Sequence, residues 1–234
     1  MKELIHMNEL VYRHEYKHTI NLLDYHSLRQ RVRAVLRTDS NAGADGCYHI
    51  RSLYFDNDDD KALREKIVGL PNREKFRIRL YNIDDAFIRL EKKSKVNGLC
   101  NKQSAKLTRE QTQRILAGDV SWMAESDESL IVEFYSKLRF QRLKPRTIVD
   151  YRREAYIFPY GNVRVTFDSD IRTGLYSTGL FDNDIPTLSV GEPGVLLLEV
   201  KYDNFLPDLL RDLIQTNTRH TGTFSKYAAC RIYG

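Results

Sequence analysis

The sequence has few cysteines and no long apolar run, which excludes several classes of protein. Its three cysteines, Cys47, Cys100 and Cys230, are odd in number and lack the spacing of a metal site, so we expect free thiols in a reducing cytosol. The apolar run from Val195 to Leu198 is far shorter than the roughly 18 residues that a membrane helix needs. The N-terminal segment lacks the apolar core of a signal peptide. These absences predict a cytoplasmic protein without a transmembrane segment.

The net charge of the chain is also small, because 37 Lys and Arg residues stand against 32 Asp and Glu residues and leave +5. That excess is too small to name a partner. A hydrophobic content of 41% with 11% aromatic residues excludes a disordered chain. A length of 234 residues is typical of one β-rich domain, which commonly has about 200–250 residues. No linker or repeat divides the chain, so we expect a single domain over residues 1–234.

Short strand-like segments dominate the chain, with helical segments between them. Alternating apolar and polar residues predict strands at Glu9–Thr19, Tyr48–Asp56, Glu74–Tyr81, Ala86–Lys93, Thr147–Phe158, Asn162–Asp168 and Val195–Tyr202. Helical periodicity and end signals predict helices at Asp24–Arg37, Ser126–Leu143, Pro207–Gln215 and Thr223–Ile232. Two shorter helices are expected, one ended by Gly69 and one between the capping box at Thr108 and Gly118. This composition indicates an α+β fold with a mostly antiparallel sheet or barrel.

Cationic side chains recur on one face of strand after strand. Alternate residues of a strand point to opposite faces, and positions 73, 75, 77 and 79 are all Arg or Lys. Apolar residues occupy the opposite face of that segment at positions 76, 78 and 80. Similar faces in other predicted strands hold Arg13, Glu15 and Lys17, then Arg89, Glu91 and Lys93, then Tyr151 and Arg153, then Arg164, and finally Glu199 and Lys201.

Two interpretations of these faces are open. A solvent-exposed face of half-buried strands accounts for any single one of them, but Arg beside Arg across a sheet is repulsive. If the sheet closes, the cationic faces surround a lumen that suits phosphate, which Arg binds bidentately and Lys binds as a point charge. The interleaved Glu residues are then candidate ligands for Mg²⁺ or Mn²⁺ that bridges protein and phosphate oxygens.

Short motifs in this order resemble the VTC polyphosphate polymerase domain, which belongs to the triphosphate tunnel metalloenzymes. The resemblance covers nearly the whole chain, and the ordered succession carries it because each motif alone is unspecific. The motifs are the segments 13–18 (RHEYKH), 51–56 (RSLYFD), 76–81 (FRIRLY), 90–93 (LEKK), 151–153 (YRR), 163–168 (VRVTFD), 198–202 (LEVKY) and 224–227 (FSKY).

The resemblance implies an eight-stranded antiparallel β-barrel with helices packed outside it, a basic tunnel and a divalent metal, Mn²⁺ or Mg²⁺. It also implies transfer of the ATP γ-phosphoryl group to a growing polyphosphate chain. By the matching motifs, the resemblance assigns phosphate clamping to Lys17, Arg77, Arg79, Lys93, Arg153 and Arg164. It assigns further phosphate contacts to Tyr151, Ser225, Lys226 and Lys106. It assigns metal binding to Glu199. The cationic faces add Arg13, Arg89 and Lys201 as phosphate contacts and Glu15 and Glu91 as metal candidates.

One departure from the superfamily bears on the type of reaction. Its first strand usually carries Glu-x-Glu-x-Lys, and here Arg13 replaces the first Glu. Losing half of the acidic pair favours the polymerase branch over the hydrolytic branches. An inorganic tripolyphosphatase and a non-catalytic polyphosphate-binding domain of the same fold stay open as alternatives. ATP and polyphosphate are the expected partners, and a membrane or regulatory partner is also open.

Two functions from other classes compete with the tunnel. Residues 14–18 match His-Glu-x-x-His, the zinc-protease signature, but that motif needs a helix, and the alternation of Arg13, Glu15 and Lys17 favours a strand. The positive charge and the 14 tyrosines are compatible with binding of single-stranded nucleic acid. We expect no nucleic-acid partner, because β propensity accounts for the scattered tyrosines.

Overall fold

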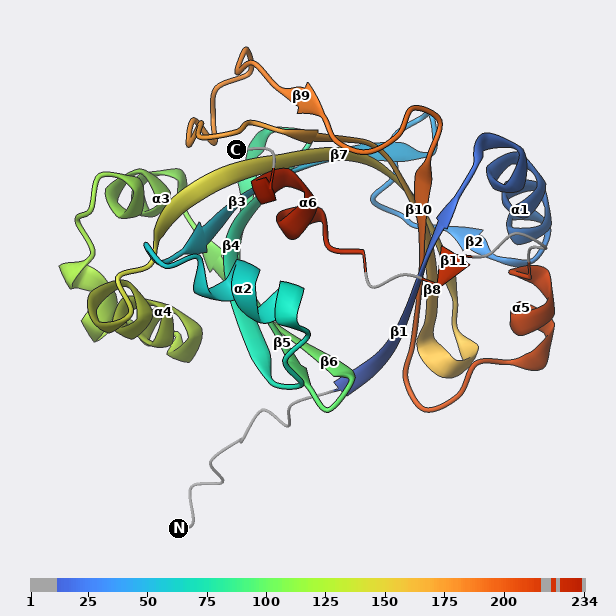
Figure 1. Ribbon diagram of the computed structural model, residues 1–234, viewed down its shortest axis with the longest axis horizontal. Helices are drawn as coiled ribbons and strands as arrows, with labels where there is room; N and C mark the ends of the chain where they lie inside the picture. The colour runs from blue at the N-terminus through green and yellow to red at the C-terminus, as the bar shows by residue number, and fades with distance from the viewer. Residues whose placement is uncertain (1–11, 216–219, 222–223, 233–234) are drawn as a thin grey trace, which may run out of the picture.

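Eight antiparallel strands close into a barrel. The computed structural model describes residues 12–215, 220–221 and 224–232 (Figure 1). Each strand pairs with the next and the last pairs with the first, in the order β7, β3, β4, β5, β6, β1, β10, β8 and back to β7. These strands are β1 (Tyr12–Ile20), β3 (Cys47–Asp56), β4 (Arg73–Tyr81), β5 (Asp84–Val96), β6 (Leu99–Leu107), β7 (Lys144–Phe158), β8 (Val163–Thr173) and β10 (Leu196–Tyr202). The predicted α+β barrel is confirmed.

Three two-residue strands lie beside this barrel. The strand β2 (Arg37–Thr38) pairs with β7, β9 (Leu188–Ser189) pairs with β8, and β11 (His220–Thr221) pairs with β1. Closure depends on the pairing of β7 with β8 and on a short contact between β1 and β6, where Tyr12 and Arg13 pair with Asn101 and Cys100.

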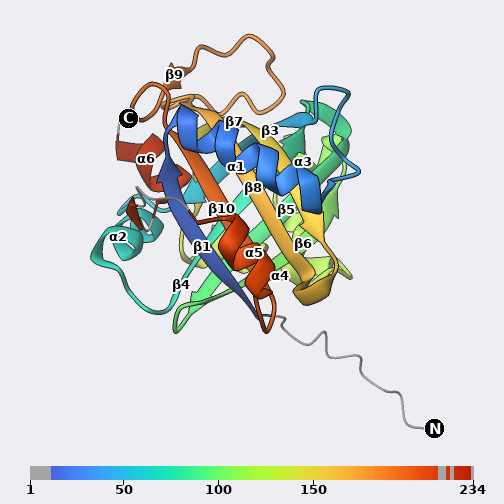
Figure 2. The same cartoon turned by 90° about the vertical axis from the view of Figure 1, so that its right-hand side faces the viewer.

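Helices cover the outside of the barrel. In Figure 1, α1 (Leu22–Val35) and α5 (Asp208–Leu213) lie on one flank, and α3 (Arg109–Leu116) and α4 (Ser129–Phe140) lie on the opposite flank. The same view places α2 (Lys61–Val68) and α6 (Lys226–Ile232) within the outline of the strands, and these two helices contact each other. Figure 2 shows α1 and α5 side by side across the outer face of β1, β8 and β10. Two 3₁₀ turns complete the described elements, at Ser121–Glu125 and Tyr160–Asn162.

The apolar faces of the strands hold the helices against the barrel. Phe76 and Ile78 of β4 are buried with Phe134 of α4 in one core, and the rings of Phe76 and Phe134 stack at 5.2 Å. On the opposite flank, Leu28 of α1 packs with Val165 of β8 in a second core. Because alternate residues point to opposite faces, this outward burial leaves the cationic faces directed into the barrel.

Several predicted element bounds differ from the structure. The strand β6 was not predicted, since its sequence LCNKQSAKL has no β-branched residue and little apolar alternation; its pairing with β5 supplies the strand conformation. The predicted helix at Ser126–Leu143 begins only at Ser129 and ends at Phe140, and Arg142 beyond it adopts a left-handed conformation. Pro145, expected to stop that helix, lies in β7 beside an irregularity in its pairing with β3.

The first predicted strand is partly confirmed. Residues 9–11 of Glu9–Thr19 lie outside the described residues, and the strand is described from Tyr12 to Ile20. A strand at residues 14–18 rules out the helix that the zinc-protease signature requires. In the described part of the chain, no helix has both the length and the apolar character to cross a membrane.

Candidate functional site

The barrel encloses a cavity of about 320 Å³ whose walls are the predicted cationic faces. Side chains reach it from all eight barrel strands and from the segment around α6. The predicted residues that the structure brings together here are Arg13, Glu15, Lys17, Arg77, Arg79, Lys93, Tyr151, Arg153, Arg164, Glu199, Lys201, Ser225 and Lys226. These residues are far apart in the sequence, so closure of the barrel assembles the site.

Three predicted site residues do not line this cavity. Arg89 and Lys106 are paired neighbours on β5 and β6; Arg89 lies over the Phe87 ring at 4.5 Å, and Lys106 is exposed. Glu91 is only 1% exposed. One of its oxygens lies 2.6 Å from Arg77 and 3.4 Å from Arg79, and the other lies 2.7 Å from Lys102. Glu91 therefore holds three cations in the wall with both of its oxygens.

Glu15 and Glu199 are the two carboxylates that face the cavity. Lys17 joins them, with its Nζ 2.8 Å from Glu15 and 3.9 Å from Glu199. Lys93 lies 2.5 Å from Glu15, and Lys201 lies 2.7 Å from Glu199. Burial would raise the pKa of Glu199, but Lys17 and Lys201 hold it well below its ordinary value. Both carboxylates are therefore anionic at neutral pH.

Asp168 of β8 anchors Arg153 and Lys226 beside this group, and it was not among the predicted site residues. Its carboxylate is fully buried and accepts two hydrogen bonds from Arg153 at 2.6 and 2.7 Å. Lys226 lies 2.5 Å from the same carboxylate. Burial raises the pKa of Asp168, but Arg153 and Lys226 outweigh burial and keep it below its ordinary value. The signal was available, since Asp168 alternates with Arg164 on the predicted cationic face.

Tyrosine hydroxyls orient three of the lumen arginines. Arg77 donates to the Tyr54 hydroxyl at 2.6 Å, Arg79 donates to the Tyr151 hydroxyl at 3.1 Å, and Arg164 donates to the Tyr48 hydroxyl at 2.6 Å. Each bond orients a guanidinium. Burial would raise the pKa of Tyr54, but Arg77, Lys75 and Arg79 outweigh burial and lower it to about 7. Tyr48 and Tyr54 were not predicted as site residues, because a tyrosine in a strand is ordinarily explained by β propensity.

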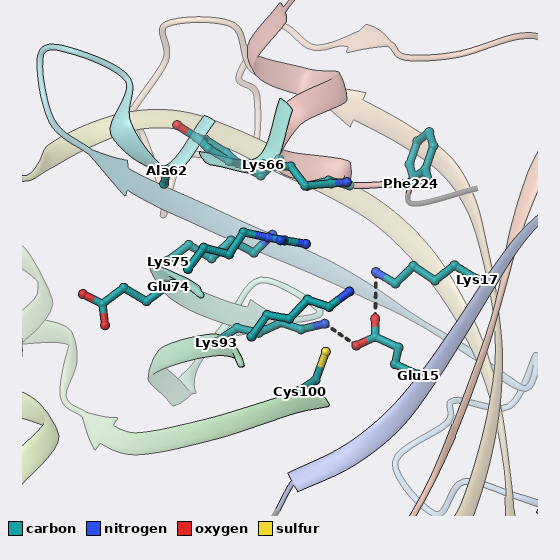
Figure 3. A pocket seen from close by; sticks show the side chains of 13 residues that line it. Glu15, Lys17, Ala62, Lys66, Glu74, Lys75, Lys93, Cys100 and Phe224 are labelled. Atoms are coloured by element: carbon teal, nitrogen blue, oxygen red, sulfur yellow. Dashed lines mark hydrogen bonds and ion pairs between the residues drawn. The ribbon is translucent and has the colours of Figure 1, made fainter. Parts of the chain in front are cut away.

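A smaller chamber of about 140 Å³ adjoins the main cavity. The two share Lys17, Lys75 and Lys93, among other residues. Figure 3 shows the ends of these three side chains converging, with Lys66 of α2 above them and Glu15 and Cys100 below them. The chamber adds Lys66, Arg73 and Lys95, which form no ion pair with a carboxylate within the described ranges. This second cluster extends the cationic lumen beyond the residues that the motifs assigned.

The donor set fits a divalent metal that arrives with phosphate. Within the described residues, no three His, Cys, Asp or Glu side chains gather as a complete metal site. Mg²⁺ in phosphate-binding sites is commonly held by one or two carboxylates, with substrate oxygens and water completing its coordination. Glu199 and Glu15 provide such a pair, since the Nζ of Lys17 lies 2.8 Å from Glu15 and 3.9 Å from Glu199.

The buried carboxylates predict a loss of stability in acid. Burial raises the pKa of Glu91, but Arg79, Arg77 and Lys102 hold it well below 4.5, and the pKa of Asp168 is likewise below 3.8. Between the folded and unfolded pKa values the unfolded chain binds more protons, so stability falls as pH falls. We expect the unfolding free energy to decrease below about pH 4.5, by up to about 1.4 kcal/mol per pH unit for each carboxylate. Urea unfolding at a series of pH values tests this, and an unchanged free energy down to pH 3 would contradict it.

The sequence and the fold were both compared with known proteins. The profile of the VTC domain family matches residues 12–232. The chain belongs to the VTC domain family. A search of the curated proteins gives no match for this VTC domain. The predicted resemblance to the VTC domain is thereby confirmed.

Solved structures with the same fold are distant in sequence. A proposed adenylate cyclase from Bacillus halodurans is 12% identical, with a TM-score of 0.52, over 90% of this chain and 96% of its own. A proposed adenylyl cyclase from Hippeastrum, described as having a dominant triphosphatase activity, is 13% identical, with a TM-score of 0.53, over 93% of this chain and 94% of its own. At identities this low, the comparison shows that this VTC domain and these proteins have the same fold, and it carries no statement about activity.

Proposed function

We propose that this VTC domain is a metal-dependent polyphosphate polymerase. It would transfer the γ-phosphoryl group of ATP to the end of a growing polyphosphate chain and release ADP. The observation that supports the proposal is the convergence of all six predicted clamp residues on one cavity inside the barrel, from five different strands. A chain of phosphates is the ligand that matches a long, enclosed and repeatedly cationic lumen.

Phosphoryl transfer asks a protein mainly for positioning and charge stabilisation. Arg77 and Arg79 of β4 form one wall, and Arg153 of β7 lies on another. Ion pairs and phenol hydroxyls fix these guanidiniums before any ligand binds, so little reorganisation is needed when charge develops on the transferred group. The acceptor phosphate is already anionic, and a strong general base is therefore unnecessary.

Glu199 and Glu15 would hold the divalent metal, which we propose to be Mn²⁺ or Mg²⁺. When bound, such an ion polarises a phosphoryl oxygen and neutralises its charge. Lys201 and Lys17 hold these carboxylates in place and keep them ionised. Lys93, which binds the other oxygen of Glu15, presents its ammonium to the same part of the lumen.

Incubation with ATP and Mn²⁺ tests the proposed function. We expect ADP and a ladder of polyphosphate on a gel, and we expect neither product when EDTA removes the metal. Because the clamp positions one phosphate next to another, polymer and ADP should accumulate together. Free phosphate as the sole product, or no turnover at all, would contradict the polymerase proposal.

A tripolyphosphatase is the second candidate function. The described triphosphatase activity of the Hippeastrum protein favours it, because that protein shares the fold over 93% of this chain. Release of phosphate from inorganic tripolyphosphate without polymer would identify this activity. Binding of polyphosphate without turnover would instead identify a non-catalytic binding domain, which is the third reading. A cytoplasmic location and any membrane or regulatory partner stay predictions.

A further inference from the structure

Lys75 occupies the junction between the two chambers of the lumen. It lies on β4 in the same inward-facing row as Arg77 and Arg79, and it lines both the main cavity and the smaller chamber. Figure 3 shows its side chain running beside that of Lys93 and toward Lys17. A phosphate chain that extends from one chamber into the other must pass this ammonium group.

The surroundings of Lys75 differ from those of its cationic neighbours. Lys17 and Lys93 each bind Glu15 within 2.8 Å, and Arg77 lies 2.6 Å from Glu91. Lys75 forms no ion pair with any described carboxylate. Its Nζ instead lies 5.3 Å from the centre of the Tyr54 ring and 5.9 Å from the centre of the Tyr227 ring. Cation–π contact is weaker compensation than a carboxylate provides.

Two fixed rings hold Lys75 in this position. The rings of Tyr54 and Tyr227 stack at 4.9 Å. The Tyr227 hydroxyl donates to Asp56 at 2.7 Å, and the Tyr54 hydroxyl accepts from Arg77 at 2.6 Å. Each ring is therefore fixed at its hydroxyl end.

This position of Lys75 destabilises the folded protein when no ligand is bound. Removal of Lys75 from bulk water, together with the nearby charges of Lys93, Lys17 and Arg77, lowers its pKa to about 7, although Tyr54 opposes the shift. An ammonium without a carboxylate partner in a lumen walled by protein destabilises the folded state. A cost of this kind is typical of residues that serve binding rather than stability.

We propose that Lys75 is a binding residue for the phosphate chain at the junction of the two chambers, with Tyr54 and Tyr227 as its positioning residues. The inference rests on the proposed function only in taking a chain of phosphates as the ligand. A polyanion supplies the negative charge that no described carboxylate provides to Lys75. Lys17, Lys93 and Arg77 are already paired with Glu15 or Glu91, so each attracts a bound polyanion less strongly than Lys75 does.

Lys75→Met and Lys75→Arg test the inference. Lys144→Met is the matched control, because Lys144 lies at the start of β7, pairs with Asp58 and does not line the lumen. The probe is inorganic tripolyphosphate, titrated calorimetrically without ATP or turnover. We expect Lys75→Met to weaken binding roughly 10- to 100-fold, as loss of a charged hydrogen bond implies, while its Tm equals or exceeds that of the wild type. Lys75→Arg keeps the charge and should retain most of the affinity, and the control should match the wild type.

Two results would overturn the inference. One is unchanged affinity in Lys75→Met. The other is a loss of affinity that accompanies a lower Tm in both Lys75 variants, because it would show that Lys75 supports the fold. Because the titration involves no catalysis, its outcome is independent of the polymerase assay. A protein that makes no polymer yet shows the expected binding pattern would refute the proposed function and leave the role of Lys75 intact.

Discussion

Replacing Glu199 with glutamine is expected to lower metal-dependent turnover of ATP at least about 100-fold while the barrel stays folded. Metal ligation by a carboxylate depends on its charge, and loss of one preorganised electrostatic contact commonly costs about 100- to 1,000-fold in rate. Glu199 lies between Lys201 at 2.7 Å and Arg153 at 3.8 Å, so glutamine also disturbs one clamp residue, Arg153, and the predicted phosphate contact Lys201. When turnover is measured against Mn²⁺ concentration, we expect a lower maximal rate and a higher Mn²⁺ concentration at half-maximal turnover.

Glu133→Gln is the matched control for this experiment. Glu133 pairs with Lys92 on the outer side of the barrel, so the same chemical change there should leave turnover near that of the wild type. If Glu199→Gln kept full metal-dependent turnover, Glu199 would not be a metal ligand. The same measurement on Lys17→Ala and Arg79→Ala should also show activity abolished, because both side chains line the cavity.

Replacing Glu91 with glutamine is expected to destabilise the protein by about 3–5 kcal/mol, the usual result of breaking a buried ion pair. The carboxylate is 1% exposed and serves Arg77, Arg79 and Lys102 together. An uncharged amide would leave these three cations without compensation inside the wall. For a protein of this size the loss corresponds to a fall in Tm of roughly 6–20 °C.

Urea unfolding measures this change, and Glu110→Gln on the exposed side of α3 is the control. The control should stay within about 0.5 kcal/mol of the wild type, as is usual for surface substitutions. Added tripolyphosphate should narrow the gap between Glu91→Gln and the wild type, because it supplies negative charge to Arg77 and Arg79. A change below about 1 kcal/mol in Glu91→Gln would show that these cations do not depend on Glu91.

The strand pattern predicted much of the site because alternation is a local property. Positions 73, 75, 77 and 79 had to share a face once that segment was a strand, whatever the rest of the chain did. The same reasoning predicted that Glu199 and Lys201 share one face of their strand. The order of short motifs then added the tunnel and most of the clamp, and thirteen of the sixteen predicted site residues line the cavity.

Local patterns failed where distant contacts decide the outcome. The strand β6 has weak strand propensity and forms because β5 pairs with it along its length. Glu91 lies on the inward row of β5, yet three cations from β4 and β6 bind it within the wall. Asp168 alternates on a predicted face, but its bonds to Arg153 and Lys226 depend on the closing pair of β7 with β8 and on the position of α6.

Because a two-residue period follows from strand geometry alone, local sequence is enough to make one face of successive strands cationic and the other apolar. The meeting of the cationic faces in a closed lumen depends instead on the tertiary structure, since closure requires pairings between strands far apart in the chain. The tertiary structure also decided which cations receive a carboxylate. Lys17 and Lys75 look alike in sequence, yet Glu15 neutralises one and two aromatic rings hold the other.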